Sequence, residues 1–134
     1  MLGEMIGELN GKWIGQRIVK RFGGEPMLER TLEEKGKILG VEVTFLATTW
    51  SKDKPQGGMF TKGNGIMMTV NGEKATLHGS GIVIPGKGPG MSVRGVRYLQ
   101  TTAPSLSRLN NVALVFEIEV TPDGMIRDKM WEWK

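Results

Sequence analysis

His78 is the only histidine of the chain, and no cysteine accompanies it. Zinc sites in proteins need several histidine, cysteine or carboxylate ligands, and the residues around His78 supply no second ligand. A lone histidine can still move protons near neutral pH, with Tyr98 or a glutamate as its partner. The competing interpretation is a surface or hydrogen-bonded histidine on a strand. No metal site is therefore expected, and a role in proton transfer stays open.

Glu117 and Glu119 form the second candidate group, because paired carboxylates serve as general acids and bases. They stand in the segment Phe-Glu-Ile-Glu-Val, where apolar and polar residues alternate. Such alternation is typical of any half-buried strand, so the pattern has a purely structural explanation as well.

The glycine-rich loop at residues 86–90 resembles a loop that binds phosphate. A dinucleotide-binding loop must open a helix inside a β-α-β unit, whereas residues 91–94 predict another strand. The sequence therefore predicts no nucleotide site, and no cofactor is expected.

The elements that position these residues are predicted to be strands. β-Favouring runs are separated by turns that contain Gly or Pro, and no stretch between them is long and periodic enough for a crossover helix. Antiparallel strands in sequence order can close on themselves, which removes exposed edges. The predicted fold class is all-β: one domain over residues 1–134, an eight-stranded antiparallel up-and-down barrel with short helical segments. The predicted strands are Lys12–Phe22, Met27–Glu34, Gly40–Trp50, Met59–Val70, Lys74–Pro85, Met91–Gln100, Leu109–Val120 and Met125–Lys134.

Turns and short helices complete the predicted topology. Asn71-Gly72 predicts a hairpin with a type I′ turn, which needs positive φ at both central residues. Residues 121–124 (Thr-Pro-Asp-Gly) predict a type I turn followed by a left-handed glycine. Residues 1–10 are expected to form a short helix across one barrel end, since their apolar residues share a face at helical spacing. Residues 103–109 can hold one helical turn.

The last hairpin predicts a register. A three-residue loop sets Glu119 opposite Arg127 and Glu117 opposite Lys129, which are two complementary pairs. A two-residue loop would instead oppose Glu117 to Asp128, so we prefer the first register. One face then becomes a core stripe, and the other carries the glutamates with Trp131 and Trp133, either in solvent or in a polar-lined cavity. The core stripe comprises Leu114, Phe116, Ile118, Val120, Ile126 and Met130.

Five glycines inside the predicted strands allow two interpretations. They mark the tight bends that close a small barrel, or they leave room for a ligand. We favour the structural interpretation. These residues are Gly63, Gly65, Gly79, Gly81 and Gly95.

Composition narrows the choice of partners and compartment. The net charge is +4, but the basic residues are scattered and interleaved with acidic ones, so nucleic acid is not an expected partner. The N-terminus has no basic region or long apolar stretch, and no membrane span is expected. The absence of cysteine is compatible with a reducing compartment, so we expect a cytoplasmic protein.

Gly11-Lys12-Trp13 opens the first predicted strand and resembles the Gly-x-Trp signature of the calycin barrels. That group comprises lipocalins, fatty-acid-binding proteins and avidin-like proteins. The resemblance implies that a basic residue from the last strand packs across Trp13 at the closed barrel end. Arg127 or Lys129 would supply it.

The second half of the chain resembles small prokaryotic barrels that are related in shape to allene oxide cyclase. The resemblance rests on Gly63-Asn64-Gly65, Gly79-Ser80-Gly81, Arg94-Gly95-Val96-Arg97 and the closing Trp131-Glu132-Trp133-Lys134. It implies an eight-stranded barrel that often self-associates, with no assured reaction and no catalytic residues to transfer.

The leading functional hypothesis is a barrel that binds a small apolar or amphipathic ligand inside, because apolar interiors are the usual ligand sites and the chain is rich in Met and Trp. A cyclase- or isomerase-like enzyme in which His78 or Glu117 moves a proton is the first alternative. A self-associating module, hence a homo-oligomer, is the second. The candidate ligand-binding residues are Trp13, His78, Arg97, Tyr98, Trp131 and Trp133.

Overall fold

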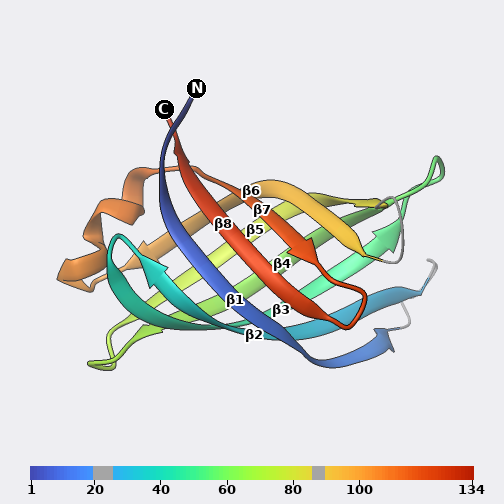
Figure 1. Cartoon of the computed structure of the whole chain (residues 1–134), viewed down its shortest axis with the longest axis horizontal. Helices are drawn as coiled ribbons and strands as arrows, with labels where there is room; N and C mark the ends of the chain where they lie inside the picture. Colours follow the sequence, from blue (N-terminus) through green and yellow to red (C-terminus); the bar gives the residue numbers. More distant parts are fainter. Residues whose placement is uncertain (20–25, 86–89) are drawn as a thin grey trace.

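The computed structural model is a closed barrel of eight antiparallel strands, in which each strand pairs with the next and β8 pairs with β1 (Figure 1). The predicted fold class is confirmed. The structure describes residues 1–19, 26–85 and 90–134. The elements are β1 (Leu2–Val19), β2 (Met27–Ile38), β3 (Val41–Asp53), β4 (Met59–Thr69), β5 (Lys74–Pro85), β6 (Met91–Thr101), the 3₁₀ helix η1 (Pro104–Asn111), β7 (Leu114–Val120) and β8 (Met125–Trp133).

The N-terminal residues form a strand, and the expected helix over residues 1–10 is wrong. β1 begins at Leu2, pairs with β8 as far as Lys12, and pairs with β2 from Gly7 onward. The β8 ladder closes the barrel and satisfies backbone groups on two edges at once. A helix of fewer than three turns is marginal in water and offers no such gain. The predicted end of this strand, at residues 20–22, lies outside the described residues.

A short helix does occur where a helical turn was expected near residues 103–109. Helix η1 covers the barrel end at which β6 finishes (Figure 1). Its Leu106 and Leu109 are fully buried. Arg108 Nε lies 2.7 Å from a carboxylate oxygen of Glu132, so an ion pair joins η1 to β8. Because η1 extends to Asn111, β7 begins at Leu114 and not at the predicted Leu109.

The Asn71-Gly72 hairpin forms with a different turn from the one predicted. Gly72 has a φ of 82°, but Asn71 is not among the residues with positive φ. The Gly72 amide donates to the Thr69 carbonyl at 3.0 Å, and the Thr69 amide donates to the Glu73 carbonyl at 2.9 Å. This is a type I turn followed by a left-handed glycine. The 121–124 turn has the predicted form of the same kind, with Gly124 at a φ of 87°.

The type I′ geometry occurs instead between β2 and β3. Leu39 has a φ of 52° and Gly40 a φ of 76°, and the flanking Ile38 and Val41 are paired. Leucine disfavours the left-handed region, so no local signal predicted this turn. The Leu39 amide donates to the Ile6 carbonyl of β1 at 2.7 Å, and the Leu39 side chain packs against the core. Tertiary contacts therefore hold this turn.

The predicted register of the last hairpin is confirmed. Glu119 pairs with Arg127, and Glu117 pairs with Lys129. All six residues of the predicted core stripe are buried. Trp131 is half-buried and Trp133 exposed on the opposite face, which is therefore the outer wall of the barrel.

Two of the strand glycines illustrate how glycine allows neighbouring strands and interior rings to come close. A Cβ atom on Gly95 would lie 2.1 Å from the Ser80 carbonyl oxygen and 2.8 Å from the Phe116 ring. A Cβ atom on Gly65 would lie 2.4 Å from the Phe45 ring. Close approach of backbone and packing of interior rings therefore account for these two glycines.

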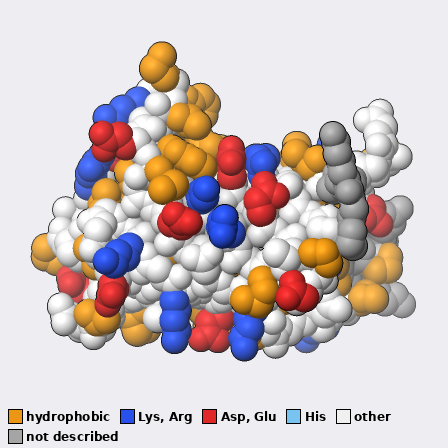
Figure 2. Space-filling view, in the orientation of Figure 1, with side chains coloured by type: hydrophobic (Ala, Val, Ile, Leu, Met, Phe, Trp, Pro, Cys, Tyr) orange, Lys and Arg blue, Asp and Glu red, His pale blue; other side chains and the backbone are white. Residues whose placement is uncertain are grey.

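Charges of both signs are interleaved over the face that carries β1 and β8 (Figure 2). The two termini lie side by side, and the Met1 ammonium donates to the Lys134 carbonyl at 2.8 Å (Figure 1). No helix within residues 1–19, 26–85 and 90–134 has the length and apolar character to cross a membrane.

Candidate functional site

A cavity of about 60 Å³ lies inside the barrel. Its walls are mainly apolar, and residues of seven strands, β1 to β7, contribute to them. The end of the cavity that Trp13, Arg30 and Met91 line, which we call its mouth, lies at the barrel end opposite η1, where β1 and β3 finish and β2 and β6 begin. The apolar wall residues include Leu32, Ala47, Leu77, Val83, Val93 and Ile118.

Arg30, Trp13 and Met91 form a bracket across the cavity mouth. The Arg30 guanidinium carbon lies 5.2 Å from the centroid of the Trp13 ring, within the range of a cation–π contact. Arg30 Nη1 also approaches the Met91 sulfur at 3.8 Å. The side chain therefore spans from β1 to β6. We call these three residues the mouth bracket.

The mouth bracket corrects what the calycin resemblance implied. The basic residue that packs across Trp13 is Arg30 of β2, whereas Arg127 is exposed and pairs with Asn10 and Glu119. Trp13 also lies at the end away from η1. The reason is the register, because Trp13 pairs with Leu32 and so comes within reach of Arg30 two residues away.

Arg97 forms the polar floor of the cavity. Its Nη1 donates a hydrogen bond to Asp128 Oδ1 at 3.0 Å, and Nη2 lies 2.8 Å from Oδ2 in the same ion pair. The same group lies 4.0 Å from the Phe116 ring centroid and 5.6 Å from that of Phe45. The carboxylate and two aromatic rings therefore hold Arg97 in one orientation.

Glu34 lies beside this ion pair and is only 1% exposed. Neither of its carboxyl oxygens has a hydrogen-bond partner among the described residues when the group is treated as ionised. Burial and the negative charge of Asp128 raise the pKa of Glu34 to about 10, although Arg97 acts in the opposite direction. Glu34 therefore holds a proton at neutral pH and can donate it to Asp128.

The three side chains together carry no net charge at neutral pH. Asp128 is negative, Arg97 is positive and Glu34 is neutral, which suits an apolar interior where an unbalanced charge is costly. Only Arg97 of the three lines the cavity. We call Glu34, Arg97 and Asp128 the buried triad.

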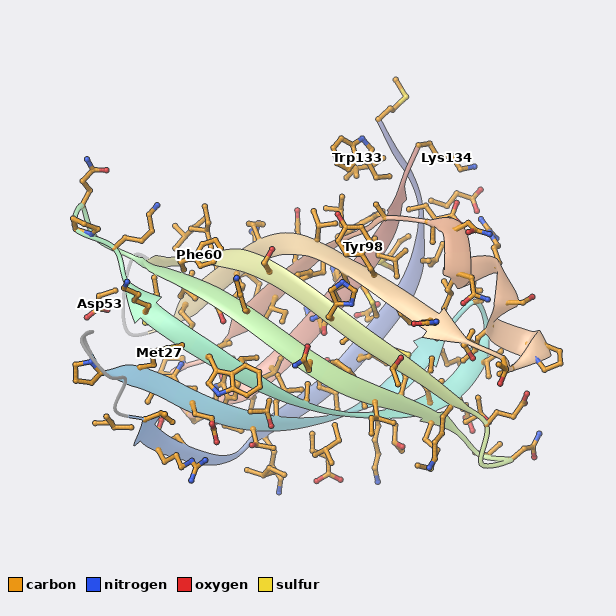
Figure 3. All side chains as sticks on the ribbon, turned by 180° about the vertical axis from the view of Figure 1, so that it is seen from behind. Met27, Asp53, Phe60, Tyr98, Trp133 and Lys134 are labelled. Atoms are coloured by element: carbon orange, nitrogen blue, oxygen red, sulfur yellow. The ribbon has the colours of Figure 1, made fainter. Side chains whose placement is uncertain are left out.

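The six candidate residues from the sequence fall into two groups. Trp13 and Arg97 lie in the interior, at the mouth and the floor of one cavity. His78 and Tyr98 lie together on the outer wall, with ring centroids 5.5 Å apart (Tyr98 is labelled in Figure 3). Trp131 and Trp133 belong to the outer face of β8. Glu117, considered for proton transfer, is also on the outer wall.

His78 and Tyr98 line a second, wider hollow on the outside of the barrel. This hollow has a volume of about 1410 Å³ and is open to solvent along strands β2 to β6. Trp50 and Leu46 contribute to the same surface. The functional roles of the six residues remain predictions.

Sequence reasoning missed Glu34 and Asp128, although a signal was present for both. Asp128 stands in phase with Ile126 and Met130, which belong to the predicted core stripe. Glu34 stands in phase with Leu32 and Gly36 on the inward face of β2. Strict alternation therefore placed both carboxylates inside.

Solved structures with the same fold share little sequence with this chain. A protein of unknown function from Clostridium acetobutylicum ATCC 824 has a TM-score of 0.82 at 11% identity, covering 98% of this chain and 99% of that one. A β-barrel-like protein from Acinetobacter baumannii AYE has a TM-score of 0.81 at 10% identity, with coverage of 100% and 96%. An enzyme from Penicillium herquei has a TM-score of 0.65 at 15% identity, with coverage of 96% and 92%.

These likenesses establish the small eight-stranded barrel and nothing finer, because all three identities are low. No family model matches the chain, and no curated protein matches it. The function of this chain must therefore be inferred from the site itself.

Proposed function

We propose that this barrel binds a small apolar or amphipathic ligand in its interior. The observation that carries the proposal is a cavity with apolar walls, one oriented polar group on its floor and a mouth at one barrel end. Ligand sites in proteins typically combine apolar walls with a few well-placed polar groups. The buried triad holds Arg97 in position for that role.

The cavity volume sets the size of the ligand. About 60 Å³ is far below the roughly 300–1,000 Å³ of a drug-sized site. A molecule of a few non-hydrogen atoms fits without any movement. A larger ligand requires the Arg30 side chain to swing away from Trp13, and a cation–π contact of this kind opposes such a movement by only about 0.5–1 kcal/mol.

The proposed function includes a relation to calycin barrels or to barrels that resemble allene oxide cyclase. Trp13 with a basic residue across its ring supports a relation to calycin barrels, although the basic residue comes from β2. The barrel shape equally fits a relation to allene oxide cyclase. A cytoplasmic location remains a prediction from composition.

The alternative function is an enzyme, because one solved structure of similar fold, from Penicillium herquei, is described as an enzyme. The proton-transfer version with His78 or Glu117 finds no support in the geometry, because both side chains lie on the outer wall. Among the described residues the buried carboxyls are Glu34, Asp128 and Glu132, and none of them lines the cavity. Binding therefore fits the site better than proton transfer.

Native mass spectrometry of the protein as purified tests the proposal. We expect an extra mass that leaves on activation. Val83→Phe, which places a ring in the cavity wall, should abolish it. Ile82→Phe is the matched control, because Ile82 is the next residue on β5 but points outward and is 42% exposed. An unliganded mass in the wild type, or equal loading of both variants, would contradict interior binding.

A further inference from the structure

We infer that the ligand is an uncharged molecule that carries an oxygen acceptor, and that Arg97 donates a hydrogen bond to this oxygen on the cavity floor. This inference rests on the proposed function and specifies the chemistry of its ligand. The supporting observations are the spare donors of Arg97, the charge of the buried triad and the polar groups at the mouth.

Arg97 has donors left for a ligand. A guanidinium carries five N–H groups; Asp128 Oδ1 accepts one from Nη1, and Asp128 Oδ2 lies 2.8 Å from Nη2. No other acceptor bonds Arg97 within the described part of the chain. Its side chain keeps 6% of its surface exposed while that of Asp128 keeps none, and Arg97 is the member of the triad that lines the cavity. The free edge therefore faces the void.

The charge of the buried triad selects against an anion. Asp128 already neutralises Arg97, and a second carboxylate on the same guanidinium would leave an excess negative charge in an apolar interior. Glu34 gives no relief, because it is neutral and supplies no positive charge. A cation is disfavoured as well, because Arg97 offers donors only. An uncharged acceptor is the group that satisfies the floor without adding charge.

The hydroxyls of the cavity are uncharged donors nearer the mouth. Ser51 Oγ donates to Thr61 Oγ1 at 3.1 Å, which leaves the Thr61 O–H as a further donor, and Thr49 also lines the cavity. Arg30 is held by Trp13, Met91 and Gln16. Arg97 is therefore the charged donor at the floor, and a hydrogen bond from it to a ligand oxygen is stronger than one from a hydroxyl.

Three isosteric probes test the inference: acetone, isobutene and acetate. Each has the same branched skeleton of non-hydrogen atoms, and they differ in one acceptor or one charge. Binding is followed by NMR on ¹⁵N-labelled protein at pH 7, using the Arg97 Nε–H resonance and the amides around the cavity. We expect acetone to shift the Arg97 resonance, isobutene to shift only amides, and acetate to cause no saturable shift at concentrations that saturate acetone.

Variants of the floor test the contribution of Arg97. Arg97→Met combined with Asp128→Leu removes the ion pair as a unit. We expect the ratio of acetone to isobutene affinity to fall about ten-fold or more, as for loss of a charged donor. Arg94→Met is the matched control, because Arg94 lies on the same strand but points outward to Glu119. It should leave the ratio unchanged.

The outcomes separate this inference from the proposed function. If isobutene binds the wild type but the Arg97 resonance and the affinity ratio do not respond, interior binding stands and the role of Arg97 is wrong. Tighter binding of acetate than of acetone also overturns the inference. If none of the probes binds, interior binding itself fails. Should the double variant not fold, the response of Arg97 in the wild type to acetone against isobutene still decides.

Discussion

Glu34 shows how the interior controls one titratable group. Its carboxyl lies in an apolar barrel beside a carboxylate that is already paired with Arg97. Burial and that neighbouring charge both disfavour ionisation, which raises the pKa to about 10. In the unfolded chain the pKa returns to its ordinary value of about 4.3. The folded state therefore holds a proton that the unfolded state releases across the neutral range.

The first prediction concerns stability against pH. Because the pKa of Glu34 is raised on folding, its contribution is fully present below pH 4.3 and is lost as pH rises towards 10. The free energy of unfolding should fall by up to about 1.4 kcal/mol per pH unit relative to Glu34→Gln, whose amide mimics the protonated acid. Urea denaturation from pH 5.5 to 8.5 measures this difference.

Glu33→Gln is the control for this slope, because Glu33 is the neighbouring residue on β2 with an exposed side chain. Its stability curve should run parallel to that of the wild type. A Glu34→Gln curve that is also parallel to the wild type would show that Glu34 is ionised in the folded protein.

The second prediction concerns the ion pair on the cavity floor. Arg97→Met leaves the Asp128 carboxylate buried without its partner, and the free energy of unfolding should fall by about 3–5 kcal/mol at pH 7. Adding Asp128→Leu should recover much of this loss, since an apolar pair replaces the ionic one. Chemical denaturation of both variants measures their free energies of unfolding and tests this prediction. If the double variant is no more stable than the single one, the uncompensated charge is not the cause.

At the scale of elements, strand-interior glycines control how closely the strands approach. β5 and β6 lie so close together at Gly95 that a Cβ atom on Gly95 would overlap with the Ser80 carbonyl oxygen. The ring of Phe116, which supports Arg97, occupies the other side of the same space. The local approach of two strands and the position of the cavity floor are therefore linked.

The third prediction follows from this close approach. Gly95→Ala should lower the free energy of unfolding by about 3 kcal/mol, the upper part of the range for overpacking. Thermal or urea denaturation measures it. Gly15→Ala is the control, since a Cβ atom there meets nothing within 4 Å, and its effect should stay within about 0.5 kcal/mol. Equal stability of the two variants would contradict the close approach of β5 and β6 at Gly95.

At the scale of the whole molecule, apolar side chains on the outer wall offer a contact surface for the predicted homo-oligomer. Exposed apolar side chains on β3 to β5 form two small clusters, one with Leu46, Ile66 and Met68 and one with Phe60, Ile82 and Ile84. Exposed apolar surface of this kind often marks contact sites between proteins. Phe60 is labelled on this side of the barrel in Figure 3.

The fourth prediction is that the wild type has the mass of more than one copy in light scattering, and that Ile66→Lys shifts it towards one copy. A buried lysine at a self-contact would be costly, whereas an outward lysine on a free wall would not. Ile18→Lys is the control, because Ile18 is 74% exposed on β1 and away from both clusters. A single-copy mass at all concentrations would contradict self-association.

The sequence by itself determined the eight strands, the places of the hairpin turns at residues 71–72 and 121–124, and the register of the last hairpin. These features depend on local chemistry: alternation with a period of two, and residues such as Pro122 and Gly124 that favour one backbone geometry. The same local rules predicted the wrong state for residues 1–10, because the partner of that segment is β8, at the other end of the chain.

Only the tertiary structure decided where chemistry can occur. Alternation shows that Glu34, Arg97 and Asp128 share the phase of core residues, but they belong to β2, β6 and β8, and only closure of the barrel brings them together. Pairing of β1 with β2 places Trp13 beside Arg30, and pairing of β5 with β6 places His78 beside Tyr98 on the outer wall. The physical reason is that the inside of a barrel depends on pairing between distant strands, and no segment encodes that pairing alone.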